Sequence, residues 1–318
     1  MGEQPVLVAG EALMDVFPDG NEDLAAAERL RHRPGGAPAN VAVALAALGT
    51  PTRLWARVGD DPFGDRIVDT LTSHGLATRF LEQDPAAPTT LALVDPSRDT
   101  FQFYRTGCAD VRLGVDGEPP GLLDGIELAV FGGVALAERS LRERITRVMT
   151  RCADRGNTVI FDPNYREVLW SEDRFRRVVG ERLSAIDVLT ATAAELITIA
   201  NAVDERTAAE RIHERGCSTI LVTAGAEGAR LYADEESPFG PVRTSHPGYR
   251  VEAIDPVGAG DAFTAGIAAE LAAGQTDPEA ALAIANAAGA LATTGQGAMA
   301  TAPTMAQVET LIEDQSHV

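Results

Sequence analysis

The chain has 318 residues, of which 45% are hydrophobic and only 5% aromatic, and its formal net charge at pH 7 is −20. No apolar run approaches the roughly 20 residues that a membrane-spanning helix needs. Every cationic side chain is an arginine, and so acidic a chain is a poor match for nucleic acid or for an anionic membrane.

The lack of lysine and the excess of acidic residues have two explanations. A GC-rich genome favours Arg over Lys but leaves the net charge of −20 largely unexplained. Adaptation to high intracellular salt accounts for both, because screening removes the self-repulsion of an acidic surface. We therefore expect a halophilic protein. We also expect a cytoplasmic one, since the apolar run at residues 5–9 is too short for a signal-peptide core.

Short apolar runs alternate with longer helical patterns along the chain. The runs that predict buried strands are Val6–Ala9, Ala129–Phe131, Val159–Phe161, Val188–Leu189 and Ile220–Val222. The stretches that predict helices are Ala39–Leu48, Phe63–Ser73, Ser140–Arg155, Thr207–Arg215, Ala262–Ala273 and Pro278–Thr293. This alternation indicates an α/β fold with a mostly parallel central sheet flanked by helices on both faces. Ligands of such folds bind at the carboxyl ends of the strands.

Two segments, residues 11–34 and about 87–113, interrupt this alternation. Within the second, Thr89–Val94 and Thr100–Tyr104 alternate between polar and apolar residues, which is typical of antiparallel strands. We expect the two segments to form a small β-strand lid over the site, within a single domain that spans residues 1–318. Residues 312–318 are predicted to be a frayed polar tail.

The most informative segment reads Asp-Pro-Val-Gly-Ala-Gly-Asp at residues 255–261 and leads into the helix predicted from Ala262. Its small residues let backbone N–H groups at a helix N-terminus face an anion, and Asp261 lies beside them. Anion attraction beside a proton acceptor is what transfer of a phosphoryl group to a hydroxyl requires. The alternative is an ordinary Gly-rich turn in which Asp261 only caps the helix.

A second Gly-rich segment reads Arg-Pro-Gly-Gly-Ala-Pro-Ala-Asn at residues 33–40. Its Gly pair lets the backbone approach a ligand closely, and Asn40 offers both a donor and an acceptor to a polyol. Together the two segments resemble the signatures of the ribokinase-like (PfkB) carbohydrate kinases, and the resemblance covers essentially the whole chain. The segments Phe103–Asp110 and Phe161–Trp170 are similar to the fructokinase branch of that family.

The resemblance implies the ribokinase-like fold and a role for particular residues. Asp261 would be the catalytic base, and the amides of Gly258, Ala259, Gly260 and Asp261 would form the anion hole. The sugar would be bound by Asp15, Gly35, Gly36, Asn40, Tyr104, Arg105 and Arg166, and the nucleotide by Thr223, Gly225, Gly228 and Asn286. Glu195 and Asp162 would act on the metal indirectly, through water or phosphate. The cofactors would be ATP and Mg²⁺, with a monovalent cation left open, and we expect a homodimer.

Most of these residues also have an ordinary structural explanation. Plain turns would account for Asp15 and Asp162, generic salt bridges for Arg105 and Arg166, an exposed helix position for Glu195, and a tight strand-to-strand turn for Thr223–Gly228. One position departs from the family pattern. Pro256 replaces the usual Thr and so removes a backbone N–H and a hydroxyl, although we still expect activity.

The resemblance implies an ATP-dependent kinase that phosphorylates a primary hydroxyl of a sugar, with fructose favoured and fructose 6-phosphate as the product. A 2-keto-3-deoxygluconate kinase is the alternative within the fold, because Arg105 and Arg166 would also suit a carboxylate. A non-catalytic sugar or nucleotide sensor is the alternative outside catalysis, and retention of Asp261 argues against it. An NAD-linked oxidoreductase would need a Gly-x-Gly-x-x-Gly turn after Val6–Ala9, which the sequence lacks.

Overall fold

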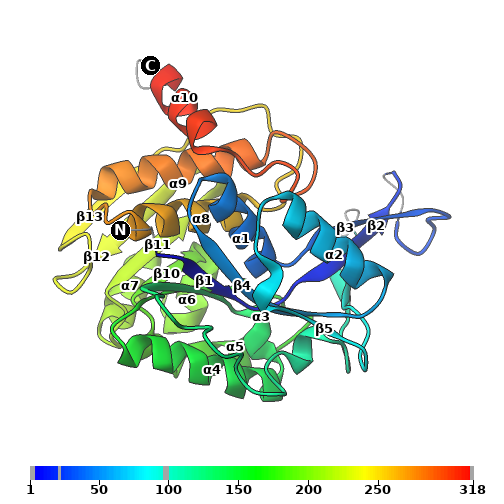
Figure 1. Ribbon diagram of the computed structural model, residues 1–318. Helices are drawn as coiled ribbons and strands as arrows, with labels where there is room; N and C mark the ends of the chain where they lie inside the picture. Colours follow the sequence, from blue (N-terminus) through cyan, green and yellow to red (C-terminus); the bar gives the residue numbers. More distant parts are fainter. Residues whose placement is uncertain (1–3, 21–22, 96–99, 316–318) are drawn as a thin grey trace.

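Parallel strands form the centre of the molecule in the computed structural model, which describes residues 4–20, 23–95 and 100–315. The large sheet consists of β1 (Val6–Ala9), β4 (Thr52–Gly59), β5 (Leu81–Asp84), β8 (Leu128–Gly132), β9 (Thr158–Asp162), β10 (Val188–Thr192), β11 (Thr219–Thr223), β12 (Ala229–Ala233) and β13 (Val242–His246). Their order is β13-β12-β11-β10-β9-β8-β1-β4-β5 (Figure 1). Neighbours are parallel except for β12, which is antiparallel to both β11 and β13. The predicted mostly parallel sheet is confirmed.

Helices cover both faces of this sheet (Figure 1). One layer contains α1 (Ala37–Ala47), α2 (Pro62–Ser73), α8 (Ala259–Ala272), α9 (Pro278–Ala292) and, packed on α9, α10 (Met305–Gln315). The other contains α3 (Val134–Ala137), α4 (Arg139–Asp154), α5 (Glu172–Gly180), α6 (Ala193–Ala200) and α7 (Glu205–His213). Within residues 4–20, 23–95 and 100–315, no helix has the length and apolar character needed to cross a bilayer.

The apolar strands separate two hydrophobic cores. On β1, Val6 and Val8 join the core beneath α1 and α8, whereas Leu7 and Ala9 join the core beneath α4. Alternate side chains of a strand point to opposite faces, so a strand buried on both sides must be apolar throughout. Burial of each such Val or Leu side chain contributes roughly 1.5–3 kcal/mol to stability.

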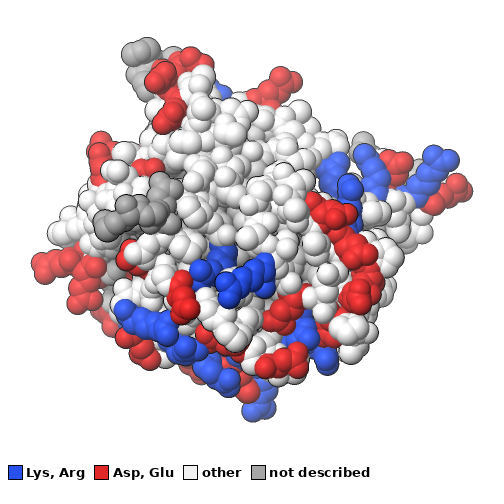
Figure 2. Space-filling view, in the orientation of Figure 1, with Lys and Arg blue, Asp and Glu red and all other residues white. Residues whose placement is uncertain are grey.

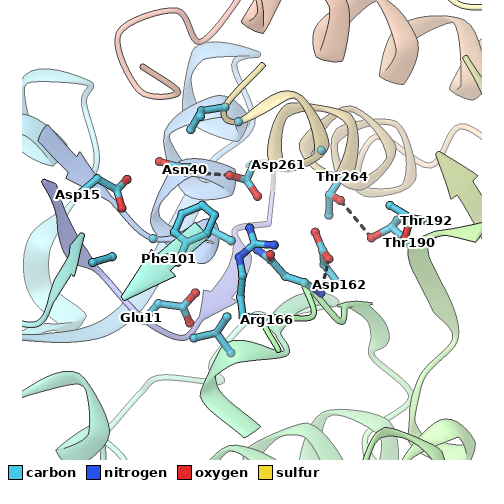
Figure 3. A pocket seen from close by; sticks show the side chains of 18 of the residues that line it. Glu11, Asp15, Asn40, Phe101, Asp162, Arg166, Thr190, Thr192, Asp261 and Thr264 are labelled. Atoms are coloured by element: carbon cyan, nitrogen blue, oxygen red, sulfur yellow. Dashed lines mark hydrogen bonds between the residues drawn. The ribbon is translucent and has the colours of Figure 1, made fainter. Parts of the chain in front are cut away.

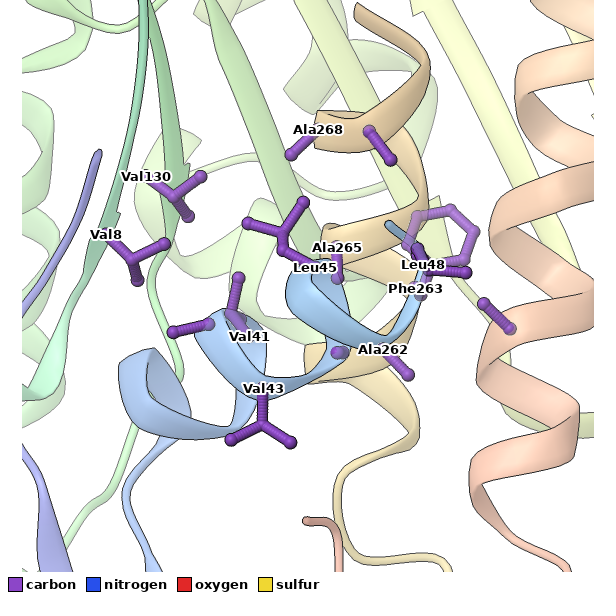
Figure 4. Packing of buried hydrophobic residues seen from close by; sticks show 14 of the residues in the cluster. Val8, Val41, Val43, Leu45, Leu48, Val130, Ala262, Phe263, Ala265 and Ala268 are labelled. Atoms are coloured by element: carbon purple, nitrogen blue, oxygen red, sulfur yellow. The ribbon is translucent and has the colours of Figure 1, made fainter. Parts of the chain in front are cut away.

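Small side chains bring α1 and α8 close together. Ala262, Ala265 and Ala268 of α8 face the side of α1 that carries Val41 and Leu45 (Figure 4). On its other side α8 packs tightly on α9, where a Cβ atom at Gly266 would lie 2.7 Å from the Cα of Ala285. This packing explains why the sequence of α8 is rich in Ala, and it places the first turns of α1 and α8 side by side.

A second, smaller sheet lies beside the large one. It consists of β2 (Leu13–Pro18), β3 (Leu30–Gly35), β6 (Leu91–Asp95) and β7 (Thr100–Tyr104), in the order β3-β2-β6-β7. The small sheet predicted for residues 11–34 and 87–113 is therefore confirmed where the structure describes it; residues 21–22 and 96–99 lie outside the described residues. The pairs β2–β3 and β6–β7 are antiparallel as predicted, but β2 and β6 are parallel.

The structure corrects the prediction for the end of the chain. Helix α10 extends to Gln315, so residues 312–315 are helical rather than frayed, and 316–318 lie outside the described residues. Val308 of α10 is fully buried, while Leu311 and Ile312 pack against the core on the same side as α9. These contacts stabilise a helix whose own sequence is mostly polar.

Candidate active site

A cavity of about 300 Å³ lies where the carboxyl ends of the parallel strands meet the small sheet. Its walls are formed by Glu11, Leu13, Asp15, Gly36, Ala37, Asn40, Ala92, Phe101, Phe103, Val134, Asp162, Asn164, Arg166, Thr190, Ala191, Thr192, Glu195, Thr223, Pro256, Val257, Gly258, Gly260, Asp261 and Thr264. The strands β9, β10 and β11 all end at this cavity, which is where ligands are expected in a parallel sheet. Figure 3 shows side chains from both sheets directed into it.

The Gly258–Asp261 segment forms the first turn of α8 at one wall of the cavity. Gly258 caps the helix with φ of +88°, a conformation that favours glycine. Among the described residues, the N–H groups of Gly258, Gly260 and Asp261 have no hydrogen-bond acceptor, whereas the N–H of Ala259 donates to Pro256 O at 3.3 Å. The predicted anion hole is therefore narrower than four amides, because the Pro256 carbonyl engages Ala259.

Asp261 is placed to accept a proton. Asn40 Nδ2, in the first turn of α1, donates to Asp261 Oδ2 at 2.7 Å (Figure 3). Burial raises the pKa of Asp261 to about 6, while the Asn40 hydrogen bond and the charge of Arg166 act to lower it. A carboxylate with this pKa is ionised at neutral pH and remains basic enough to take a proton from a reacting hydroxyl.

Asp15 projects into the cavity from β2, and its carboxylate lies against Gly35 of β3, two residues along from its register partner Arg33. A Cβ atom at Gly35 would lie 2.0 Å from Asp15 Oδ2, so glycine is needed there to make room for the carboxylate. Gly35 itself does not line the cavity, whereas Gly36, with φ of +100°, does. Burial, and then the charge of Asp261, raise the pKa of Asp15 to about 7.

Asp162 and Glu195 lie together at the ends of β9 and β10. Glu195 forms a capping box with Thr192, whose N–H donates to Glu195 Oε2 at 2.8 Å, and its Oε1 accepts from Tyr165 N at 2.7 Å. Asp162 Oδ1 accepts from Asn164 N at 3.0 Å. Burial, followed by the charges of Glu195 and Asp261, raises the pKa of Asp162 well above its usual range. Such a cluster suits a cation held through phosphate or water, and the described residues contain no group of three or more metal-ligating side chains.

Arg166 supplies positive charge to this acidic cavity. Its guanidinium lies 4.9 Å from the centre of the Phe101 ring on β7, and its Nη1 donates to Tyr165 O at 3.3 Å. Arg166 acts to lower the pKa of both Asp15 and Asp261. The residue thus connects the small sheet to the loop after β9.

Two residues predicted to bind the sugar lie elsewhere. On β7, Phe101 and Phe103 line the cavity, so Tyr104, which points to the other face of the strand, is 60% exposed. Arg105 is buried: its Nε donates to Asp110 Oδ2 at 2.6 Å and its Nη1 to Val134 O at 2.9 Å. The structure therefore does not bring either side chain to the cavity.

On the predicted nucleotide side, Thr223 lines the cavity at the end of β11. Gly225 and Gly228 form the turn from β11 to β12, outside the cavity, and a Cβ atom at Gly228 would lie 2.0 Å from His246 O. Asn286 is buried in α9, where its Nδ2 donates to Leu282 O at 2.7 Å. The structure gives Gly228 and Asn286 roles in packing and does not bring them to the cavity.

Sequence reasoning missed several residues of the cavity wall. Thr190 and Thr264 join β10 to α8 through a contact of 3.1 Å between their hydroxyl oxygens. Glu11 directly follows β1 and is only 2% exposed. The rule that ligands bind at the carboxyl ends of strands could have identified Glu11 and Thr190, since each lies in or just after a buried strand.

Comparisons with known proteins agree with this geometry. Residues 3–305 match the model of the pfkB family of carbohydrate kinases. The chain belongs to the pfkB family of carbohydrate kinases. A fructokinase from Klebsiella pneumoniae is 35% identical over 308 residues, which cover 94% of this chain and 96% of that protein.

Two solved structures show the same fold as this carbohydrate kinase. The fructokinase from Xylella fastidiosa with bound ATP is 29% identical with a TM-score of 0.87, and 99% of each chain is covered. The fructokinase from Vibrio cholerae O395 with fructose, ADP and a calcium ion is 30% identical with a TM-score of 0.85, covering 98% of this chain and 99% of that one. The predicted α/β fold of ribokinase-like type is confirmed.

Proposed function

We propose that this carbohydrate kinase transfers the γ-phosphoryl group of ATP to the 6-hydroxyl of fructose, giving fructose 6-phosphate and ADP. The observation that carries the proposal is the position of Asp261. Its carboxylate is bound to Asn40 of the first Gly-rich signature and lies in the first turn of α8, beside three backbone N–H groups that have no acceptor among the described residues. A proton acceptor and an anion site therefore meet at one point of the cavity.

In the proposed mechanism, Asp261 takes the proton of the sugar hydroxyl as that oxygen attacks the γ-phosphorus. The bond from phosphorus to the bridging oxygen of ADP breaks as the new bond forms. The N–H groups of Gly260 and Asp261 and the positive end of α8 stabilise the negative charge on the transferring group. The small sheet keeps water away from the cavity, which limits hydrolysis of ATP.

The cavity also suits Mg²⁺ carried by the nucleotide. Both oxygens of Glu195 already accept hydrogen bonds from the protein, so Glu195 would act on the metal through water, and Asp162 through water or phosphate. When bound, the metal would neutralise charge on the β- and γ-phosphates. The raised pKa of Asp162 fits a site that is completed by a cation.

The charge of the cavity favours a neutral sugar over a sugar acid. Its wall carries Glu11, Asp15, Asp162, Glu195 and Asp261 against one cation among the described residues, Arg166. Arg105, which could have bound a carboxylate, is held by Asp110 instead. A substrate carboxylate would therefore meet five acidic side chains and a single cation, Arg166, so repulsion would outweigh attraction. The names of the relatives agree with fructose.

The experiment that tests the proposal is a coupled ADP-release assay with fructose, 2-keto-3-deoxygluconate, ribose and adenosine. We expect kcat/KM for fructose to exceed that for the others by at least about tenfold. Faster turnover of 2-keto-3-deoxygluconate would replace fructose with the sugar acid. No turnover of any of the four would favour a sensor.

The same assay at low and multimolar KCl tests adaptation to salt. Figure 2 shows acidic side chains around the edge of one face, with Arg side chains gathered over α4. We propose that activity is retained or raised in multimolar KCl, because screening weakens repulsion within a chain of net charge −20. The homodimer, the cytoplasmic location and the single domain over residues 1–318 stay predictions; light scattering in solution measures the first.

A further inference from the structure

A second pocket, of about 540 Å³, lies between α4 and α5, in the helix layer on the other side of the sheet from α1 and α8. Figure 2 shows Arg side chains gathered over α4. The chain as a whole has 47 acidic and 27 basic side chains, so a local excess of arginine runs against its composition. We call this site the arginine pocket, and its charged lining consists of Arg139, Arg142, Arg174, Arg177 and Arg182, with Glu143 and Glu181.

Two arginines at the base of the arginine pocket are half-buried and held by uncharged partners. Arg142 Nη1 donates to Leu136 O at 3.0 Å, and Arg174 Nη2 donates to Ala137 O at 2.5 Å. A guanidinium has five N–H donors, so one such bond fixes its position and leaves other donors free. A carbonyl oxygen also leaves the positive charge in place. The base of the pocket is therefore both ordered and positively charged.

The carboxylates around the arginine pocket neutralise only part of its charge. Glu143 pairs with Arg139 at 3.3 Å, and Glu181 pairs with Arg182 at 3.6 Å. Glu138 lies nearby, but its carboxylate accepts hydrogen bonds from the first N–H groups of α4. Among the described residues, no carboxylate lies within 4.0 Å of the other three guanidiniums. Five arginines thus face two glutamates at the pocket.

The arginines consequently repel one another. Burial, and then the charge of Arg174, lower the pKa of Arg142. Burial, and then the charge of Arg142, lower the pKa of Arg182. The exposed guanidinium of Arg177 has no hydrogen-bond or ion-pair partner within the part of the chain that the structure describes. An anion in the pocket would relieve this repulsion and accept the free N–H donors without displacing a protein acceptor.

We propose that the arginine pocket binds a small anion that carries a phosphate group. A phosphate is doubly charged near neutral pH, and its oxygens match the forked donors of guanidinium groups. The half-buried base behind the exposed Arg139 and Arg177 fits a small anion better than the acidic surface of a protein. No residue lines both this pocket and the active-site cavity, so the proposal adds a second site and does not depend on which sugar is phosphorylated.

Helix α3 lies between the two sites. Val134, at its start, lines the active-site cavity, while the carbonyls of Leu136 and Ala137, at its end, accept from Arg142 and Arg174. An anion that holds these two guanidiniums also holds the end of α3. We therefore expect 10 mM inorganic phosphate to slow amide hydrogen exchange in α3 at least about twofold relative to NaCl of equal ionic strength. Unchanged exchange in α3 would contradict the proposal.

The main test measures the affinity of wild type for inorganic phosphate and for glucose 6-phosphate by calorimetry, with thermal melts as a second readout. At 10 mM, either compound should raise the melting temperature by about 2–4 °C more than NaCl of equal ionic strength. The compound that binds more tightly shows whether free phosphate or a phosphorylated metabolite is the better ligand. Stabilisation of wild type no greater than that by NaCl would overturn the proposal, whatever the variants do.

Two variants locate the anion. Arg174→Gln and Arg177→Gln should each raise the Kd for phosphate about tenfold or more, because each removes one charged, forked donor. Arg177→Gln is the safer variant for folding, since the Arg177 guanidinium is exposed and binds no described group. If both variants keep the wild-type Kd, the anion binds elsewhere, for instance in the active-site cavity, and the proposal is wrong.

Arg206→Gln is the matched control, because it makes the same change of charge on α7, where Arg206 is exposed and pairs with Glu210 at 3.8 Å. This variant should keep the Kd for phosphate within about twofold of wild type. Equal weakening in Arg206→Gln and Arg177→Gln would show only general attraction by net charge and overturn the proposal. So would light scattering in which Arg177→Gln abolishes self-association while phosphate binding persists, since the pocket would then be a contact between copies of the chain.

Discussion

Asn40 Nδ2 donates a hydrogen bond of 2.7 Å to Asp261 Oδ2, which joins two residues that are 221 positions apart in the chain. The bond links the first turn of α1 to the first turn of α8. It also links the two Gly-rich signatures from which phosphoryl transfer to a polyol was predicted. One hydrogen bond therefore couples the predicted sugar-binding segment to the predicted base.

Removal of that bond should change the pH dependence of catalysis. In Asn40→Ala the pKa of Asp261 should rise, because the Asn40 hydrogen bond acts to lower it. The acid limb of the plot of kcat/KM against pH should then move to higher pH. At pH 7, kcat/KM should fall by about 10- to 100-fold. Asp261→Asn is the reference: it should lower kcat by at least about 10³-fold while ATP binding stays within about twofold. An unchanged acid limb in Asn40→Ala would argue against Asp261 as the base.

The two glycines of the α8 turn should respond differently to Ala. At Gly258, φ is +88° and an added Cβ would lie 2.3 Å from the Cβ of Ala298. Gly258→Ala should therefore lower the free energy of unfolding by at least about 2 kcal/mol and also lower kcat. At Gly260 an added Cβ meets no atom within 4 Å, and the residue lines the cavity. Gly260→Ala should keep the melting temperature within about 2 °C but weaken ATP turnover. Thermal melts and steady-state kinetics on both variants distinguish packing from anion binding.

The face of β7 that carries Phe101 should matter for the sugar, and the other face should not. Phe101→Ala removes an aromatic wall of the cavity and the contact of 4.9 Å with the Arg166 guanidinium, so KM for fructose should rise by about tenfold. Tyr104→Ala, on the exposed face, should leave KM within about twofold. A larger effect at Tyr104 would mean that its side chain reaches the sugar after all.

The ligand-free protein should lose stability as the pH rises toward 7. Burial raises the pKa of Glu11 and Asp15 to about 7 and that of Asp261 to about 6. A carboxyl whose pKa is raised by folding contributes stability below its unfolded-state pKa, and this contribution disappears as pH rises through the folded-state pKa. As these carboxyl groups ionise, the free energy of unfolding should therefore fall between about pH 4 and pH 7.

The measurement is the melting temperature of Asp15→Asn against wild type at pH 6 and pH 8, without ligands. Since the substitution removes a buried charge, it should raise the melting temperature at pH 8 by about 2–4 °C and by less at pH 6, while lowering activity. Asp69→Asn, at an exposed position of α2, is the control and should change neither the melting temperature nor the activity. A lower melting temperature of Asp15→Asn at pH 8 would contradict the sign of the Asp15 shift.

The parts of the fold that local sequence determines were predictable. The continuous apolar run Val6–Ala9 coincides with β1, and the Pro278–Thr293 helix ends within one residue of α9. The strand β4 was missed because its apolar pattern is interrupted by Arg57. That arginine can be buried because Glu82 and Asp84, from the neighbouring strand β5, pair with it at 3.2 and 3.1 Å, and Asp116 pairs with it at 2.9 Å. Such long-range partners are not visible in a local pattern.

The site was predicted unevenly for a similar reason. The two Gly-rich signatures carry their geometry in their own residues, so Asn40 and Asp261 were found. Which face of β7 lines the cavity depends on its pairing with β6, and the sequence does not distinguish Phe101 from Tyr104 on that basis. The ion pair of Arg105 with Asp110, only five residues away, was the one local signal that could have removed Arg105 from the sugar-binding set.

Because α1 packs against α8, the groups for phosphoryl transfer and the groups that select the sugar belong to different parts of the fold. The groups that would perform the transfer lie at the starts of two helices held together along their length by Ala side chains, whereas Leu13, Asp15, Ala92, Phe101 and Phe103 come from the small sheet. Mutations in the small sheet can therefore alter which sugar fits without moving Asp261 relative to the α8 turn. For engineering, such a scaffold offers a route to new acceptor sugars: residues of the small sheet can be varied while the two helices are kept intact.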